Sequence, residues 1–142
     1  MTGGLLLYGA NGYTGRLILD TALREGLRPV LAGRRREVIE PLARSAGLEF
    51  LVFPLDDAGT AAAALEPFDA LLLAAGPFSR TSAAAFEACL AARTSYLDIT
   101  GEVSVFEALF SGDDRAKAAG IAVLPGVGFD VVPTDCLAAL LA

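Results

Sequence analysis

The sequence predicts an α/β fold in which one doubly wound parallel sheet lies between two layers of helices. Short apolar runs alternate along the chain with longer segments of helical period. The first apolar run ends in a glycine-rich turn, and 54% of the 142 residues are hydrophobic, as expected for a sheet buried on both faces. Such alternation gives parallel strands with right-handed crossovers, so we expect a three-layer α/β/α Rossmann arrangement with strand order 3-2-1-4-5-6.

The individual elements follow from this alternation. Six apolar runs are predicted to be strands: residues 5–8, 28–32, 49–54, 70–74, 95–99 and 121–124. Five segments between them are predicted to be helices: residues 14–25, 36–45, 57–65, 82–92 and 103–119. Gly26 is expected to end the first helix in a left-handed conformation. Pro41 is expected to interrupt the second helix or to lie in its first turn, and residues 111–114 are expected to break the fifth helix in two.

The composition excludes several classes of function. The sequence contains no histidine, which removes Ser-His-Asp and Cys-His catalysis and the commonest metal ligand. Cys89 and Cys136 are too far apart in sequence for a Cys-x-x-Cys pair, so we expect two buried thiols and no metal site. No apolar run reaches the roughly 18 residues of a membrane span, and Leu5–Leu7 lacks the flank of a secretion signal, so a cytoplasmic location is expected.

Charge is distributed unevenly along the chain. The formal net charge is −6, but residues 1–48 carry +3 while residues 49–142 carry −9. An acidic protein has little general attraction for nucleic acid, so no nucleic-acid partner is predicted. The local positive excess lies next to the glycine-rich turn and predicts a site for one small anion.

A phosphate-binding loop is predicted between the first strand and the first helix. Gly9, Gly12 and Gly15 have the spacing Gly-x-x-Gly-x-x-Gly in a strand–turn–helix context. The first glycine permits the tight turn, the second lets the backbone approach a pyrophosphate, and the third lets the helix pack on the strand. The predicted cofactor-binding loop comprises Gly9, Ala10, Asn11, Gly12, Tyr13, Thr14 and Gly15.

The end of the second strand predicts which dinucleotide is bound. NAD-binding proteins carry Asp or Glu there for the ribose 2′-hydroxyl, whereas this chain has three arginines. A guanidinium pairs with a 2′-phosphate, so we expect NADP (NADPH), with Arg34 as the first candidate and Arg35 as the second. The alternative is that these arginines are solvated at a helix entry. Asp56, after the third strand, is either an acceptor for the adenine amino group or a helix cap, a role that Asp57 shares.

Further candidates lie at the carboxyl ends of the later strands. Small residues after the fourth strand would let a cofactor lie against the backbone: Ala75, Gly76 and Pro77. Carboxylates after the fifth and sixth strands are substrate-side candidates or turn and cap residues: Asp98, Glu102 and Asp130. No residue is predicted to be the catalytic acid or base.

Four motifs together resemble one known family. They are Gly-Ala-Asn-Gly-Tyr-Thr-Gly at residues 9–15, Ala-Gly-Pro-Phe at 75–78, Ala-Cys at 88–89 and Tyr-x-Asp-x-Thr-Gly-Glu at 96–102. In these motifs the chain resembles the saccharopine dehydrogenase-like NAD(P)-dependent oxidoreductases, which include saccharopine reductases and trans-acting enoyl reductases. The resemblance implies the N-terminal NADP-binding domain of a reductase whose C-terminal domain closes over the substrate. Ser82 and Arg93 depart from the pattern, which has glycines there.

The resemblance also implies a domain organisation. Residues 1–130 are expected to form the NAD(P)-binding domain, and residues 131–142 to begin the connection to a C-terminal substrate domain missing from this chain. Residues 136–142 start an apolar helix whose face needs cover, either from that domain or from a second copy in a homo-oligomer. We favour the missing domain.

The expected activity is hydride transfer between NADP(H) and a small-molecule substrate, completed by groups outside this chain. Lys117 is the only lysine and has no tyrosine at the Tyr-x-x-x-Lys spacing of a self-contained short-chain dehydrogenase. The chain alone is therefore expected to bind NADPH and to reduce nothing. The alternative is a non-catalytic redox sensor in which NADP occupancy controls a partner. Amino-acid-derived imines, enoyl thioesters and lipid-linked ketones stay open as substrates.

Overall fold

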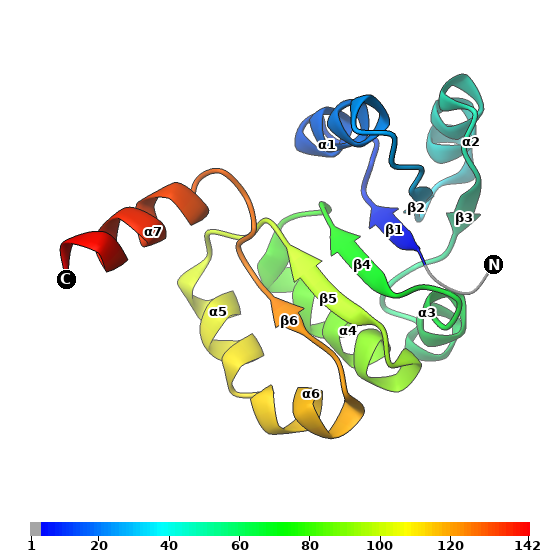
Figure 1. Ribbon diagram of the computed structural model, residues 1–142. Helices are drawn as coiled ribbons and strands as arrows, with labels where there is room; N and C mark the ends of the chain where they lie inside the picture. The colour runs from blue at the N-terminus through cyan, green and yellow to red at the C-terminus, as the bar shows by residue number, and fades with distance from the viewer. Residues whose placement is uncertain (1–3) are drawn as a thin grey trace.

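A computed structural model describes residues 4–142 and shows three layers, with one sheet between two groups of helices (Figure 1). The strands are β1 (Leu5–Tyr8), β2 (Val30–Gly33), β3 (Phe50–Val52), β4 (Ala70–Leu73), β5 (Ser95–Asp98) and β6 (Val123–Leu124). The helices are α1 (Tyr13–Arg24), α2 (Arg36–Ala46), α3 (Ala58–Leu65), α4 (Phe78–Ala92), α5 (Val103–Phe110), α6 (Asp113–Ala119) and α7 (Val132–Leu141).

The sheet has the predicted topology. Its strand order is β3-β2-β1-β4-β5-β6, and every neighbouring pair is parallel, which confirms the fold class. In the centre, Leu7 of β1 lies in register with Leu31 of β2 and Leu72 of β4. From β1 the chain adds β2 and β3 toward one edge of the sheet, and from β4 it adds β5 and β6 toward the other. Ligands of doubly wound sheets bind in the crevice that this reversal leaves at the carboxyl ends of the strands.

Two apolar cores form, one on each face of the sheet (Figure 1). The smaller core joins α1 and α2 to the sheet through Leu7, Leu31 and Ile39. The larger core packs helices α3, α4, α5 and α6 on the other face of the sheet and includes Leu6 and Tyr96. Neighbouring residues of β1 thus serve opposite cores, which is why the strand is apolar throughout instead of alternating.

One helix begins well before its predicted start, and a predicted helix break is confirmed. Helix α4 begins at Phe78, four residues earlier than predicted, because the Glu102 carboxylate accepts hydrogen bonds from the backbone N–H groups of Phe78 and Ser79. A partner distant in sequence therefore completes the helix start. The predicted break of the fifth helix is confirmed, since α5 ends at Phe110 and α6 begins at Asp113.

Pro41 neither interrupts α2 nor lies in its first turn, so the prediction for this residue was wrong. It lies inside the continuous helix on its exposed face. Its ring removes the N–H that would bond to the carbonyl of Glu37, and this exposed part of the helix leaves that carbonyl open to water. Water can bind that carbonyl, so proline destabilises the helix less here than it would at a buried position.

Of the two positions where the family pattern has glycine, only Arg93 has a backbone conformation that favours it. Gly26 has a φ of +77°, as predicted for the turn after α1. Arg93 ends α4 with a φ of 57° and is the one residue other than glycine with positive φ among residues 4–142. This left-handed conformation favours glycine. Ser82 is buried inside α4, where a small residue fits the core.

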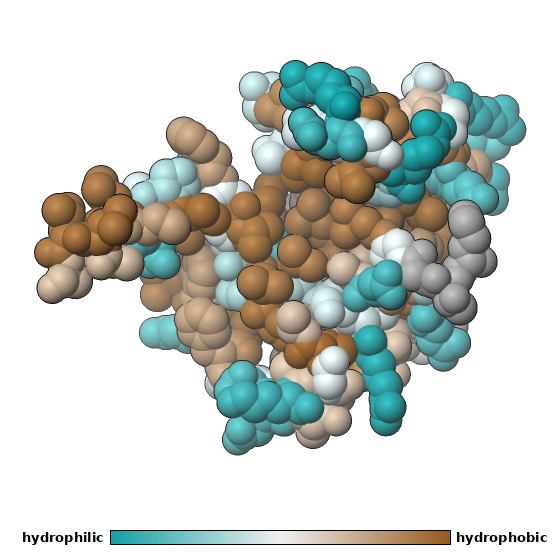
Figure 2. Space-filling model, in the orientation of Figure 1, coloured by the Kyte–Doolittle hydropathy of each residue, from teal (hydrophilic) through white to brown (hydrophobic). Residues whose placement is uncertain are grey.

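Helix α7 extends away from the sheet and has no buried residue (Figure 1). Figure 2 shows apolar side chains over this helix and over the sheet between the helical layers, and Phe129, Leu140 and Leu141 are strongly exposed. Cys136 is exposed on α7, so the prediction of two buried thiols holds only for Cys89. Across residues 4–142, no helix combines the length and apolar character needed to cross a membrane.

Candidate dinucleotide-binding site

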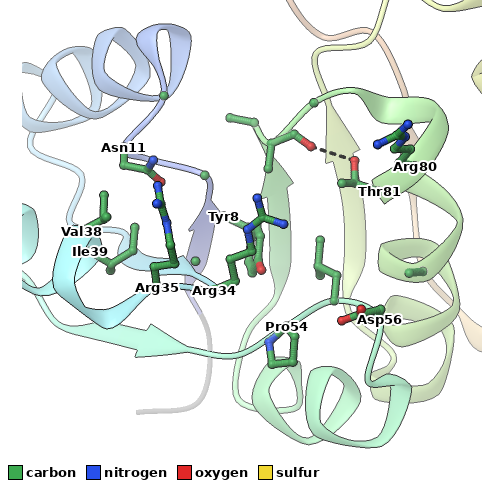
Figure 3. A pocket seen from close by; sticks show the side chains of 18 of the residues that line it. Tyr8, Asn11, Arg34, Arg35, Val38, Ile39, Pro54, Asp56, Arg80 and Thr81 are labelled. Carbon is green, nitrogen blue, oxygen red and sulfur yellow. Dashed lines mark hydrogen bonds between the residues drawn. The ribbon is translucent and has the colours of Figure 1, made fainter.

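A cleft of about 640 Å³ opens at the carboxyl ends of the central strands (Figure 3). It lies where the loops after β1, β2, β3 and β4 meet, which is the crevice expected from the strand order. Nine predicted cofactor residues line it: Gly9, Asn11, Gly12, Arg34, Arg35, Asp56, Ala75, Gly76 and Pro77. The topology therefore brings together residues from four separate parts of the sequence.

Gly9 and Gly15 are required by the shape of the loop itself. Gly9 has a φ of +90°, and a Cβ there would lie 2.9 Å from both the carbonyl carbon of Ala74 and the backbone nitrogen of Ala75. A Cβ on Gly15 would overlap the carbonyl oxygen of Gly9. These two glycines let β1, α1 and the end of β4 approach one another. Ala10 is buried beneath the same turn.

Gly12 is different, because the protein itself leaves room for a side chain there. Its φ of −70° suits any residue, and an added Cβ would meet only the Gly9 carbonyl oxygen, at an ordinary 3.5 Å. Gly12 precedes α1 and lines the cleft. The first backbone N–H groups of a helix have no partner within it, so an anion above Gly12 would meet free donors and the positive end of the helix dipole.

Tyr13 and Thr14 belong to the first turn of α1, and their side chains are exposed outside the cleft. Tyr13 is 83% exposed. Their backbone N–H groups remain available at the helix start, whereas the structure places neither the phenol nor the hydroxyl at the cleft wall. Of the predicted loop, Gly9, Asn11 and Gly12 line the cleft, whereas Tyr13 and Thr14 do not.

The arginines after β2 have separate roles. Arg34 and Arg35 are exposed and line the cleft, with Arg34 in its middle and Arg35 directed toward the Asn11 side (Figure 3). Arg36 instead pairs with Glu40 on α2, with 3.2 Å between Nη1 and Oε2. Burial raises the pKa of Tyr8, and the positive charge of Arg34 acts to lower it.

Of the two neighbouring aspartates, Asp57 is the one that caps α3. The Asp57 carboxylate accepts hydrogen bonds from the backbone N–H and the hydroxyl of Thr60, at 3.1 Å and 2.7 Å, and so caps α3. The Thr60 hydroxyl, followed by the Thr60 N–H, lowers the pKa of Asp57. Asp56 is exposed, lines the cleft and is free of the capping role.

The loop after β4 forms the adjoining edge of the cleft. The Thr81 hydroxyl donates to the carbonyl oxygen of Ala75 at 2.7 Å, and the Gly76–Pro77 peptide bond is cis. Glu102 occupies the amide groups at the start of α4, and its pKa is lowered by a hydrogen bond from the Ser79 side chain and then by backbone N–H groups. At neutral pH this carboxylate is an ionised helix cap.

Asp98 is buried at the end of β5 and does not line the cleft. It is fully buried, and it accepts hydrogen bonds from the Tyr96 hydroxyl at 2.6 Å and from the N–H groups of Thr100 and Gly126 at 3.0 Å and 2.8 Å. Burial raises the pKa of Tyr96, so the phenol stays protonated and donates. Asp98 thus ties the turns after β5 and β6 together and is not placed to contact a substrate.

Asp130 is exposed just before α7 and does not line the cleft. Its carbonyl oxygen accepts a hydrogen bond from the Thr134 hydroxyl at 3.1 Å. Among the carboxylate and thiol side chains of residues 4–142, no group of three is placed to hold a metal ion.

The family model for the saccharopine dehydrogenase NADP-binding domain matches residues 5–124, which is most of the chain. The chain belongs to this family. The match begins with β1 and ends with β6, so it covers the whole six-stranded sheet of this saccharopine dehydrogenase-type domain.

Relatives of this saccharopine dehydrogenase-type domain are oxidoreductases by name. It is 30% identical over 139 residues to a trans-acting enoyl reductase of Mycobacterium tuberculosis, covering 92% of this chain and 33% of that protein. It is 24% identical to a saccharopine dehydrogenase-like oxidoreductase of Bos taurus, covering 92% and 35%. The chain thus spans about a third of the length of these relatives.

A solved structure shares the fold. The apo saccharopine dehydrogenase (L-Glu forming) of Saccharomyces cerevisiae superimposes with a TM-score of 0.76 at 18% identity, covering 92% of this chain and 28% of that one. At this identity the likeness concerns the fold alone. It agrees with the strand order seen here.

Several cleft residues of this saccharopine dehydrogenase-type domain were missed from the sequence. Tyr8 directly precedes the glycine loop, and its position at a strand end could have drawn attention to it. The others come from strand ends, from α2 and from α4, where no motif marks them: Gly33, Val38, Ile39, Pro54, Leu55, Ala74, Arg80, Thr81 and Ala84. Only the tertiary structure shows that α4 forms a wall of the cleft.

Proposed function

We propose that the cleft binds NADPH and that the chain is the NADP-binding part of a reductase of this family. One observation carries the proposal. The glycine loop that precedes α1 and the arginine pair Arg34–Arg35 border the same cleft, although they come from different turns. NADP carries two anionic groups, a pyrophosphate and a phosphate on the adenosine 2′-oxygen. A helix start beside a cluster of guanidinium groups can bind both.

The residues present fit such a cofactor. The N–H groups at the start of α1 would hold the pyrophosphate above Gly12, where the protein leaves the space of a Cβ unfilled. Arg34 and Arg35 would pair with the 2′-phosphate, and Asp56 would accept a hydrogen bond from the adenine amino group. Ala75 and Gly76 offer a side-chain-poor edge for the remainder of the dinucleotide.

When bound, NADPH supplies a hydride to an electrophilic carbon of the substrate. The residues of this chain bind and orient the cofactor. Asp98 and Glu102 already hold structural hydrogen bonds, so neither is free to donate a proton to a substrate. We therefore propose that the proton donor and the substrate pocket lie outside this chain. The name of the trans-acting enoyl reductases among the relatives supports reduction of an enoyl group.

Cofactor titration tests the proposal. Binding of NADPH and NADH would be followed by nicotinamide fluorescence for the native chain and for Arg34→Ala. We expect the native chain to prefer NADPH, and Arg34→Ala to weaken NADPH binding about 10-fold to 100-fold while leaving NADH nearly unchanged, because only NADPH presents the phosphate that pairs with the guanidinium.

Arg24→Ala is the matched control. It removes the same charge from the far end of α1, where Arg24 contacts only Thr21 among the hydrogen bonds of the described residues. Its affinities should equal those of the native chain. Absence of NADPH binding by the native chain, or equal affinities for the two dinucleotides, would contradict the proposal.

A further inference from the structure

Arg80 is a third guanidinium at the cleft, and it lies on the wall opposite the other two (Figure 3). It is the third residue of α4, and its side chain is exposed. Thr81 and Ala84 lie on the same face of the helix and also line the cleft. Helix α4 thus presents one cation above a surface of small side chains.

The fold gives no reason for a cation at this position. Across residues 4–142, Arg80 forms no ion pair. A positive charge in the first turn is disfavoured by the helix dipole. The helix start does not need it either, because Glu102 already accepts hydrogen bonds from the N–H groups of Phe78 and Ser79. The guanidinium is therefore available to a ligand in the cleft that Arg80 lines.

The wall beneath Arg80 suits a flat base and not a phosphate. Pro54, Leu55 and Ala84 supply apolar surface, and Asp56 supplies a carboxylate that would repel a phosphate and accept a hydrogen bond from an amino group. The amides and guanidinium groups suited to phosphates lie across the cleft, at the glycine loop and the β2–α2 turn. The adenine ring is the part of a dinucleotide that matches this wall.

We propose that the guanidinium of Arg80 covers the face of the adenine ring and holds it against the β3–α3 turn. This inference rests on the proposed function. Arginine is planar and stacks on aromatic faces, and a guanidinium over an aromatic face contributes about 0.5–2 kcal/mol, which is about 2-fold to 30-fold in affinity. NADPH and NADH share adenine, so Arg80 adds affinity for both, whereas Arg34 distinguishes between them.

The test compares Arg80→Ala, Arg80→Lys and Arg24→Ala with the native chain, using calorimetric titrations of NADPH and NADH at low and high salt. Arg80→Ala should weaken the binding of both dinucleotides by the same factor, at least about 2-fold. The factor should persist at high salt, because stacking is screened less than attraction between exposed charges. Arg80→Lys keeps the charge but lacks the planar group, so it should lose most of the same affinity.

Each contrary result overturns the inference in a recognisable way. Selective loss of NADPH binding would assign Arg80 to the 2′-phosphate. A loss that disappears at high salt, or full rescue by Arg80→Lys, would assign it to the pyrophosphate as a simple charge. Unchanged affinities would remove Arg80 from the site while leaving the proposed function intact. That function fails only if the native chain binds neither dinucleotide.

Discussion

At the scale of single residues, three glycines with one motif spacing have two different physical roles. Gly9 and Gly15 are fixed by the protein, since a Cβ on either would strike neighbouring backbone. Gly12 is not fixed in this way, because its conformation and its protein contacts allow a side chain. Two glycines of the Gly-x-x-Gly-x-x-Gly spacing are therefore required by the fold, and under the proposed function the third is required by the pyrophosphate.

This difference gives a prediction for Gly12→Ala and Gly15→Ala. Gly15→Ala should destabilise the fold by about 1–3 kcal/mol, because its Cβ overpacks against the Gly9 carbonyl. Gly12→Ala should change the free energy of unfolding by less than about 0.5 kcal/mol but weaken NADPH binding at least about 10-fold, because the methyl group occupies the approach of the pyrophosphate. Urea unfolding and NADPH titration measure the two effects.

The two variants serve as controls for each other. If Gly12→Ala binds NADPH like the native chain, the pyrophosphate does not lie above this residue. If Gly15→Ala is as stable as the native chain, the Gly9 carbonyl can move away from the added methyl group, and the fold does not require glycine at residue 15.

At the scale of elements, the carboxyl ends of β5 and β6 depend on one buried side chain. Asp98 closes β5 and accepts hydrogen bonds from Tyr96 on the same strand, from Thr100 in the next turn and from Gly126 after β6. Strand β6 has only two residues, so its own ladder is short. The carboxylate supplies connections that the strand does not.

We predict that Asp98→Ala destabilises the fold by about 3–5 kcal/mol, because three buried donors lose their acceptor. Asp98→Asn should cost only about 1 kcal/mol, since its amide oxygen can accept the two backbone bonds and the Tyr96 hydroxyl can turn to accept. Thermal and urea unfolding of the pair provide the measurement. Equal costs for both variants would show that the carboxylate charge matters more than its hydrogen bonds.

At the scale of the whole molecule, the site is a positive region on an acidic protein. The net charge is −6, yet Arg34, Arg35 and Arg80 all lie at one cleft. The overall charge repels a polyanionic dinucleotide at long range, while the guanidinium groups attract it locally. Salt screens exposed charges over about 8–10 Å at physiological concentrations, so the local attraction is itself sensitive to salt.

The preference for NADPH over NADH should therefore shrink as salt rises. We expect the ratio of the two affinities to fall at least about 3-fold between 50 mM and 500 mM NaCl, because the 2′-phosphate meets exposed arginines. NADH serves as the internal control, since it shares every other group. A ratio independent of salt would indicate that the 2′-phosphate is bound by neutral donors instead of Arg34 and Arg35.

The sequence by itself determined the topology and half of the site. Alternating apolar and amphipathic segments specify a parallel sheet because crossover handedness and burial leave few other arrangements, and the observed strand order agrees. The glycine loop and the arginines after β2 were also predictable, because each interacts with residues next to it in the chain or with a ligand. Local sequence carries that information directly.

Tertiary structure decided the remainder, because it depends on contacts between distant residues. The early start of α4 comes from Glu102, the burial of Asp98 comes from turns after two strands, and Arg80 reaches the cleft only because α4 packs beside the β3–α3 turn. The sequence places these charged residues near strand ends without saying whether each faces solvent, a helix start or a ligand. Packing makes that choice, since a buried charge must find partners that no local pattern records.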